Sequence, residues 1–140
     1  MTENIKVANG YVGRRFLAAL IDYSMQLGIF YALALNLGEP NDDGGYSLPG
    51  SLGLLPLLFW MILIVGMEQL TGATFGNGIM GLKPVTLSGG KPTFVQYFKR
   101  HLVDMIDMFF LGLVGYLIIK NTPLKQRLGD LWAKTVVVRG

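Results

Sequence analysis

Two long apolar stretches constrain this chain more than any other feature. Residues 16–37, as an α-helix rising about 1.5 Å per residue, are long enough to cover a bilayer hydrocarbon core of about 30 Å. Residues 52–70 form a second stretch, in which no charged side chain precedes Glu68. Residues 16–37 and 52–70 are therefore predicted to cross a membrane as two helices.

The composition agrees with a chain that lies in lipid. Apolar residues make up 51% of the 140 residues and charged residues 15%, and the mean hydropathy is +0.46, which is too apolar for an ordinary soluble domain. The net charge of +3 lacks the basic face that nucleic-acid binding requires. Without cysteine and with one histidine, a zinc site is not expected. We predict one membrane domain over residues 1–140, with no metal, cofactor or nucleic-acid partner.

The charges of the two connecting loops predict the orientation of the chain. Residues 38–50 contain acidic side chains and no Lys or Arg, whereas residues 71–100 contain basic side chains and no acidic one. Basic loops near span ends stay in the cytoplasm. The N-terminus, with Arg14 and Arg15, and the second loop are therefore expected inside, and the first loop outside.

The path of the third apolar segment, residues 102–119, is left open. The segment is long enough to cross, yet aspartates lie near its start and glycines in its middle. A simple crossing would put the basic C-terminal tail outside, against the charge rule. A broken or re-entrant segment is favoured over a spanning one, although a re-entrant turn needs protein around it because lipid-exposed irregular backbone is forbidden.

Two short runs, Gly81–Leu87 and Lys134–Arg139, have the β-type composition of strands. They pair only if they lie on the same side of the membrane, and Pro84 confines its strand to an edge position. The predicted fold class is therefore an all-α membrane protein with two full transmembrane helices, a third broken, re-entrant or spanning helix, and a small cytoplasmic β-hairpin-like element.

One face of the first span is polar. Arg15, Asp22 and Gln26 are spaced at i, i+7 and i+11, which places them on the same side of a helix. An aspartate two turns inside a span is costly and faces a partner helix, a water-filled cavity or an ion path. Two interpretations follow: Asp22 is a proton or cation site, or it is held in a structural ion pair by an arginine elsewhere.

Two stretches of the chain are similar to each other in sequence. The stretch Arg14–Asp22 aligns with Lys99–Asp107, and in both an aspartate follows an arginine by seven residues. The alignment predicts two helices that enter the membrane from the same side, as in a parallel repeat, unless the few identities arise by chance.

The second copy of this pattern carries further candidates. Arg100 and His101 are spaced to meet Asp104 on the surface of one helix. Asp107 lies another turn inward among apolar neighbours, where a carboxylate holds its proton more tightly, as a proton-coupled carrier requires. Glu68 is a weaker candidate, because its position near the end of the second span is shallow enough to reach water.

The run Gly76–Gly81 matches G-x-G-x-x-G by letter but follows a membrane helix rather than a strand. No dinucleotide-binding unit surrounds it. Its glycines are expected to form tight turns at the membrane surface.

Three stretches carry a family resemblance. They are Arg15–Asp22, with the pattern R-x-x-A-x-x-I-D, Gly72–Leu82, and the tail Gln126–Val138, which reads Q-R-L-G-D-L-W-A-K-T-V-V-V. From about Tyr11 to Val138 the chain resembles the RDD family of small membrane proteins.

The resemblance implies a role for particular residues. The family is named for one arginine and two aspartates, which correspond here to Arg15, to Asp22, and to either Asp107 or Asp130. Its most specific part is the tail motif, which contains Arg127, Gly129 and Asp130. The chain departs from the family pattern where Asn77 replaces a usual lysine and where Pro84 interrupts a strand. The resemblance implies a multi-pass protein of the bacterial cytoplasmic (inner) membrane, with a supposed role in transport and, for some members, in sodium–proton exchange.

These observations lead to one expected function and one alternative. The expectation is a small transporter for monovalent cations or protons; two spans cannot enclose a pathway, so it would act as a homo-oligomer in the lipid bilayer. The alternative is a non-transporting scaffold that binds lipids or partners through its basic face. No catalytic arrangement stands out, so an enzyme is not expected. The candidate transport residues are Arg15, Asp22, Gln26, Glu68, Asp104 and Asp107.

Overall fold

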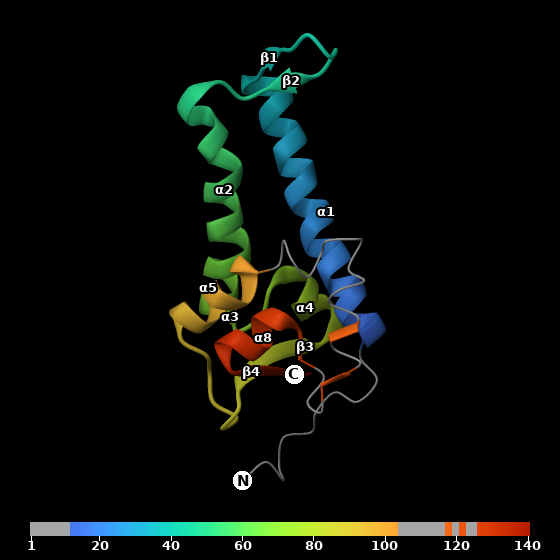
Figure 1. Cartoon of the computed structure of the whole chain (residues 1–140), viewed down its shortest axis with the longest axis vertical. Coiled ribbons are helices and arrows are strands. Elements are labelled where there is room, and N and C mark those ends of the chain that lie inside the picture. The colour runs from blue at the N-terminus through green and yellow to red at the C-terminus, as the bar shows by residue number, and fades with distance from the viewer. Residues whose placement is uncertain (1–11, 104–116, 119–120, 123–125) are drawn as a thin grey trace.

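Two helical legs and a compact base make up the chain (Figure 1). The computed structural model describes residues 12–103, 117–118, 121–122 and 126–140. The first leg is the single helix α1, Val12–Leu37, which begins four residues before the predicted span and so includes Arg14 and Arg15. In Figure 1 the two legs stand side by side; the short strands β1 and β2 lie at their upper end, and the short helices and the strands β3 and β4 gather at their lower end.

The second leg is helical throughout but changes its winding. A 3₁₀ turn comes first, then α-helix, then a wider π-helical segment, then a last α-helical turn. The segments are η1 Gly50–Leu54, α2 Leu55–Trp60, η2 Met61–Gly66 and α3 Met67–Thr71. Pro56 lies in the first turn of α2, where its missing amide donor breaks no helical hydrogen bond.

Both legs are long and apolar enough to cross a membrane, which agrees with the two predicted spans. Only 11% of the most apolar window of each leg is buried within the chain. Such an extended apolar surface has to be covered by lipid or by other chains.

The acidic loop between the legs contains a small hairpin that the sequence did not predict. Strands β1, Glu39–Pro40, and β2, Tyr46–Ser47, pair antiparallel. The side chain of Asn41 accepts a hydrogen bond from the amide of Gly45 at 2.8 Å. Loop polarity was predicted correctly, but two-residue strands are too short to leave a periodic pattern.

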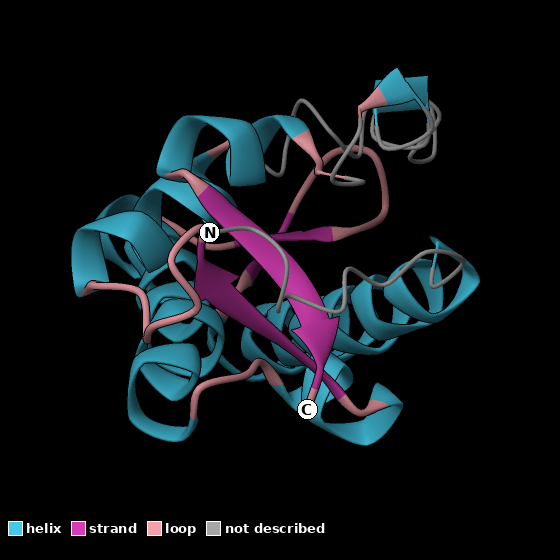
Figure 2. Cartoon of the chain, turned by 90° about the horizontal axis from the view of Figure 1, so that it is seen from below, coloured by secondary structure: helices cyan, strands magenta, loops and turns pink. Residues whose placement is uncertain are grey.

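In the described part of the base, short helices surround a two-stranded sheet (Figure 2). Strand β3 pairs antiparallel with β4, which confirms the predicted pairing of the two β-type runs. The strands are distant in sequence, so they form a sheet but not a true hairpin. The helices are α4 Phe75–Met80, α5 Phe94–Leu102 and α8 Leu128–Ala133, and the strands are β3 Leu82–Thr86 and β4 Thr135–Arg139.

The base contains a structural repeat. The α4–β3 unit and the α8–β4 unit each consist of a six-residue helix, one left-handed residue and a five-residue strand. The left-handed positions are Gly81, with φ 68°, and Lys134, with φ 55°. Pro84 and Val137, the middle residues of the strands, lie opposite each other. The two units are therefore related by an approximate twofold axis that passes through the sheet.

The predicted third segment falls mostly outside the described residues. Helix α5 ends at Leu102, and residues 104–116 and 119–120 are not described. The choice between a crossing and a re-entrant path therefore stays a prediction.

Two glycines allow helices of the base to touch their neighbours. A Cβ atom on Gly76 would overlap the backbone carbonyl of Ala18 in α1, and one on Gly129 would overlap the carbonyl of Arg100 in α5. The expectation that the glycines of 76–81 form turns is therefore wrong for Gly76, which lies inside α4. It is right for Gly81, whose left-handed backbone ends that helix.

Gly76→Ala should destabilise the fold by about 1–3 kcal/mol, because the new methyl group would push α4 away from α1. Gly78→Ala is the matched control on the same helix, since nothing lies within 4 Å of a Cβ there. That control should be neutral or slightly stabilising. Denaturant unfolding in detergent measures both, and equal stability of the two variants would contradict the close packing of α1 and α4.

Candidate functional site

A chain of buried ion pairs connects four helices at the lower end of the legs. Arg15 of α1 forms an ion pair with Asp130 of α8. Asp130 Oδ1 also accepts a hydrogen bond from Arg100 Nε of α5 at 2.8 Å. Arg100 Nη1 donates to Glu68 Oε1 of α3 at 2.6 Å, and His101 Nε2 lies 2.6 Å from Glu68 Oε2. Each carboxylate in this series of ion pairs, Glu68 and Asp130, therefore binds two basic side chains.

The side chains of Arg100, Glu68 and Asp130 are fully buried. Moving such groups out of water costs several kcal/mol for each ion, and only close opposite charges with good hydrogen bonds offset that cost. The ion pairs are therefore a condition for burying these residues at all.

The shifts in pKa follow from this pairing. Burial alone would raise the pKa of Asp130, but Arg15, Arg100 and Arg127 hold it well below its ordinary value. Burial alone would lower the pKa of Arg100, but Glu68 and Asp130 raise it above its ordinary value. Both groups are therefore charged over the whole physiological range.

Helix α5 presents its basic residues to the base from one face. Tyr97, Arg100 and His101 are buried at i, i+3 and i+4. The helix starts with a capping box in which Thr93 and Gln96 satisfy each other's backbone amides. The same Gln96 donates from Nε2 to the carbonyl of Ala133 at 2.9 Å, which fastens α5 to the end of α8.

Asp22 lies apart from this ion-pair chain and is bound by neutral donors. Its Oδ2 accepts a hydrogen bond from Thr74 Oγ1 at 2.6 Å, and its Oδ1 accepts from the amide of Gly76 at 2.7 Å. Thr74 also caps α4 by accepting from the amide of Asn77. Within the described ranges Asp22 has no salt bridge, so the arginine partner expected for its structural interpretation is not found there.

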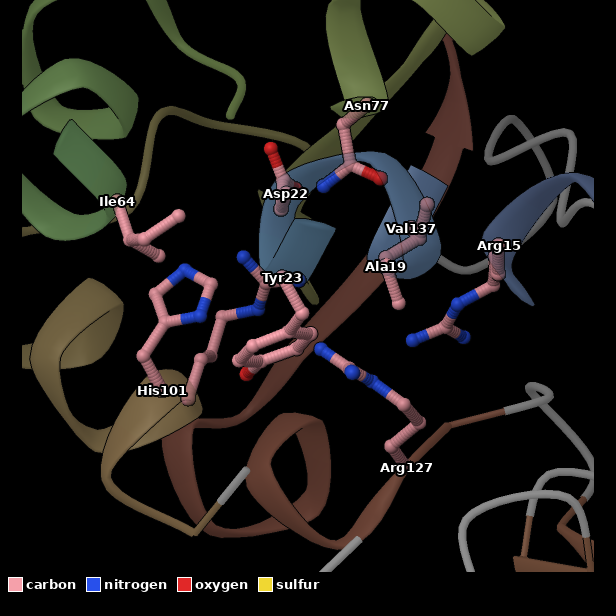
Figure 3. A pocket seen from close by; sticks show the side chains of 10 residues that line it. Arg15, Ala19, Asp22, Tyr23, Ile64, Asn77, His101, Arg127 and Val137 are labelled. Carbon is pink, nitrogen blue, oxygen red and sulfur yellow. The ribbon is translucent and has the colours of Figure 1, made fainter. Parts of the chain in front are cut away.

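A cavity of about 20 Å³ lies between Asp22 and the ion-pair chain. This volume holds one or two water-sized molecules. Figure 3 shows the side chains of Arg15, His101 and Arg127 approaching the same space from different elements. Among the described residues, no group of three or more His, Asp or Glu is arranged to hold a metal ion. The ionisable lining residues are Arg15, Asp22, Tyr23, Arg100, His101 and Arg127.

The predicted polar face of α1 points into the structure along its whole length. Arg15 and Asp22 are buried in the base, and Gln26 donates from Nε2 to the carbonyl of Pro56 at 3.0 Å, which joins α1 to α2. The spacing of these residues thus identified the contact face of the helix correctly. What each one contacts is contributed by distant segments, which spacing alone cannot reveal.

One prediction about accessibility is wrong. Glu68 was expected to reach water from a shallow position, but its exposed fraction is 0% because α5 covers it. Asp104 and Asp107, the other two carboxylate candidates, lie outside the described residues. Arg100 and His101 were predicted to pair locally with Asp104, whereas the partners described for them are the distant residues Glu68 and Asp130.

Sequence reasoning missed the central position of Arg100 and the contribution of Thr74. The signal for Arg100 was present, since the internal alignment matched it with Arg15, and both arginines bind Asp130. Of the two residues considered for the second aspartate of the family name, Asp130 is therefore the one with a described arginine partner. In the tail motif, Gly129 allows α8 to contact α5, and the amide of Arg127 donates to Asp130 at 3.1 Å.

Asp130→Asn should lower the free energy of unfolding by about 3–5 kcal/mol, because it leaves two buried arginines without their shared carboxylate. Asp43→Asn makes the same chemical change at an exposed position and should have no measurable effect. Thermal and denaturant unfolding in detergent compare the two. A loss of less than about 1 kcal/mol in Asp130→Asn would show that the ion-pair chain does not hold the base together.

The contribution of Asp130 to the free energy of unfolding should be lost only at low pH. Its folded-state pKa lies below the unfolded value of about 3.9, so the stabilisation is present above that pH and is lost as the pH falls through the folded pKa. The pKa of Arg100 is raised in the folded state, so its stabilisation of the fold is fully present at every pH below the pKa of the unfolded chain. The unfolding free energies of the wild type and Asp130→Asn should differ by a constant amount from about pH 5 to 8 and converge below about pH 4. Convergence already between about pH 7 and 5 would contradict this assignment.

Comparison with known proteins gives a match to one family model. No curated protein matches the chain, and no solved structure matches it. The family model described as the RDD family matches residues 10–134, which is most of the chain and includes both legs and the tail motif as far as Lys134. The chain therefore belongs to the RDD family.

Proposed function

We propose that this protein exchanges a proton for a monovalent cation across the membrane, with Asp22 as the exchanging group. The observation that carries the proposal is the environment of Asp22. It is 6% exposed, lines the cavity, and is bound by neutral donors from Thr74 and Gly76. Taking up a proton or a cation there breaks no ion pair.

The other described buried carboxylates are less suited to exchange. Glu68 and Asp130 each bind two basic side chains. Protonating either one would remove a negative charge that a buried arginine pairs with, which costs several kcal/mol. Their role in the proposal is to hold in place the basic side chains that line the cavity beside Asp22.

The position of Asp22 along α1 also supports the proposal. Between Asp22 and Glu39, no residue of the sequence is charged. Asp22 therefore marks the boundary between the charged base and the apolar part of the legs. Ionisable residues at such a depth are commonly part of substrate or ion pathways.

A complete pathway would need more than this pair of legs. Lining a solvated path takes several helices with converging polar faces, so we propose a homo-oligomer in which the segment with Asp104 and Asp107 contributes. We also propose that the base lies in the cytoplasm of a bacterial inner membrane. Exposed basic residues belong to the base and exposed acidic ones to the opposite loop, as the charge rule requires. They are Lys83, Lys91, Lys134 and Arg139 in the base, and Glu39, Asp42 and Asp43 in the loop.

A second function, a scaffold that binds lipids or partner proteins, is favoured by a different observation. Phe94 of α5 and Trp132 of α8 are each nearly half exposed. The ammonium group of Lys99 lies 5.3 Å from the ring centre of Trp132, which places a basic group beside this apolar surface. In that function the buried charges would serve only to hold the base together.

Asp22→Asn should reduce cation-driven proton movement to the level of protein-free vesicles, because asparagine carries no exchangeable negative charge. Its side-chain oxygen can still accept from the amide of Gly76, so folding and insertion should be retained. The measurement is the internal pH of proteoliposomes, read with a pH-sensitive dye, after a sodium or potassium gradient is applied.

Asp42→Asn is the matched control in the exposed loop and should transport like the wild type. Normal flux through folded Asp22→Asn would refute the role of Asp22. If the wild type itself moves no ion above the protein-free level, the scaffold function is the one that remains.

A further inference from the structure

We propose that the cavity binds one small monovalent inorganic anion, of about the size of a halide ion, next to Arg100. The site lies in the same cavity as Asp22 but next to Arg100, and it does not depend on the exchange proposed for Asp22, because a bound anion can serve a static purpose. Neither the family match nor the transport expectation implies it.

The starting point is a buried nitrogen without a partner. Arg100 is fully buried; its Nε donates to Asp130 and its Nη1 to Glu68. Its third guanidinium nitrogen, Nη2, is buried and has no hydrogen-bond partner in the part of the chain that the structure describes. Buried donors are nearly always satisfied, by protein, water or a bound ion. Arg100 lines the cavity, so an occupant of the cavity is the available acceptor.

The charge of the cavity wall favours an anion over water. Three guanidinium groups and one imidazole line it, from α1, from α5 and from the residue that precedes α8; they are Arg15, Arg100, Arg127 and His101. Glu68 and Asp130, which neutralise part of this charge, are not among the lining residues. In a site of low dielectric, several cations around one space stabilise a negative charge far more than they would in water.

Among the described lining residues of the cavity, the one carboxylate already accepts hydrogen bonds from other partners. Asp22 is the carboxylate in its wall, and both of its oxygens accept hydrogen bonds, from Thr74 and from Gly76. Among the described residues, neither Asp22 nor any other side chain accepts a hydrogen bond from Arg100 Nη2. An anion in the cavity would supply that acceptor together with a negative charge beside the basic wall.

Size limits the ligand. A volume of about 20 Å³ is room for one or two water-sized particles, which suits a halide ion better than a phosphate or a lipid headgroup. An anion at this position would connect α1, α5 and the start of α8, and should therefore stabilise the folded base.

Ligand-dependent stability tests the site. The full chain, in nanodiscs of zwitterionic lipid, is unfolded by heat while sodium chloride replaces sodium gluconate at constant ionic strength. We expect a saturable rise in Tm of about 2–4 °C with chloride, a similar rise with bromide, and no saturable rise with phosphate. A Tm independent of the anion would mean that the cavity holds only water and would overturn the proposal.

A cavity-filling variant locates the effect. Ala19 lines the cavity on α1, so Ala19→Leu blocks the space without removing a charge. Ala32→Leu makes the same change at an exposed position on the same helix. The chloride effect should vanish in the first variant and persist in the second. An undiminished chloride effect in folded Ala19→Leu would place the anion elsewhere and refute the site.

A second measurement covers the case in which Ala19→Leu does not fold. Chloride NMR on the wild type in nanodiscs should show line broadening beyond that of protein-free nanodiscs, and bromide should reverse it by competition. Absence of that broadening, or broadening that bromide leaves unchanged, would count against the site.

Discussion

The base of this protein depends on one buried guanidinium group. Arg100 binds Glu68 of α3 and Asp130 of α8 at once, and all three side chains are withdrawn from water. Unpaired, each of them would be too costly to bury. Because the partners come from three different helices, the ion pairs can form only when these helices have assembled. The need to pair these buried charges therefore specifies how the second leg, α5 and α8 pack together.

The approximate twofold symmetry of the base explains how two arginines reach the same aspartate. The units α4–β3 and α8–β4 meet across the sheet, with Pro84 opposite Val137. Gly76 lets the first unit contact α1, and Gly129 lets the second contact α5. Arg15 and Arg100 thus approach Asp130 from two sides, while Asp22 lies on the first unit's side of the cavity. Ion pairs therefore lie on one side of the cavity, and on the other side Asp22 accepts hydrogen bonds from uncharged donors only. This difference in partners distinguishes Asp22 from Glu68 and Asp130.

Much of the architecture could be predicted from local patterns. The two long apolar helices follow from apolar length, the pairing of β3 with β4 from two β-type runs, and the inward face of α1 from the spacing of Arg15 and Asp22. The site was predicted less well. Glu68 was placed at a water-accessible depth although α5 covers it completely, and Arg100 was given a local partner although its described partners are distant. The repeat of helix and strand was also missed, because the two units share a glycine and a valine but little else in sequence.

The sequence by itself determined which segments are apolar enough for lipid and which helix face carries polar atoms. These properties depend on neighbours within a few residues, where helix and strand periodicity make spacing informative. The tertiary structure alone decided which charges meet. Glu68 and Arg100 are 32 positions apart and Arg15 and Asp130 are 115 apart. No periodicity connects such distances, since ion pairs over them exist only after the helices have packed.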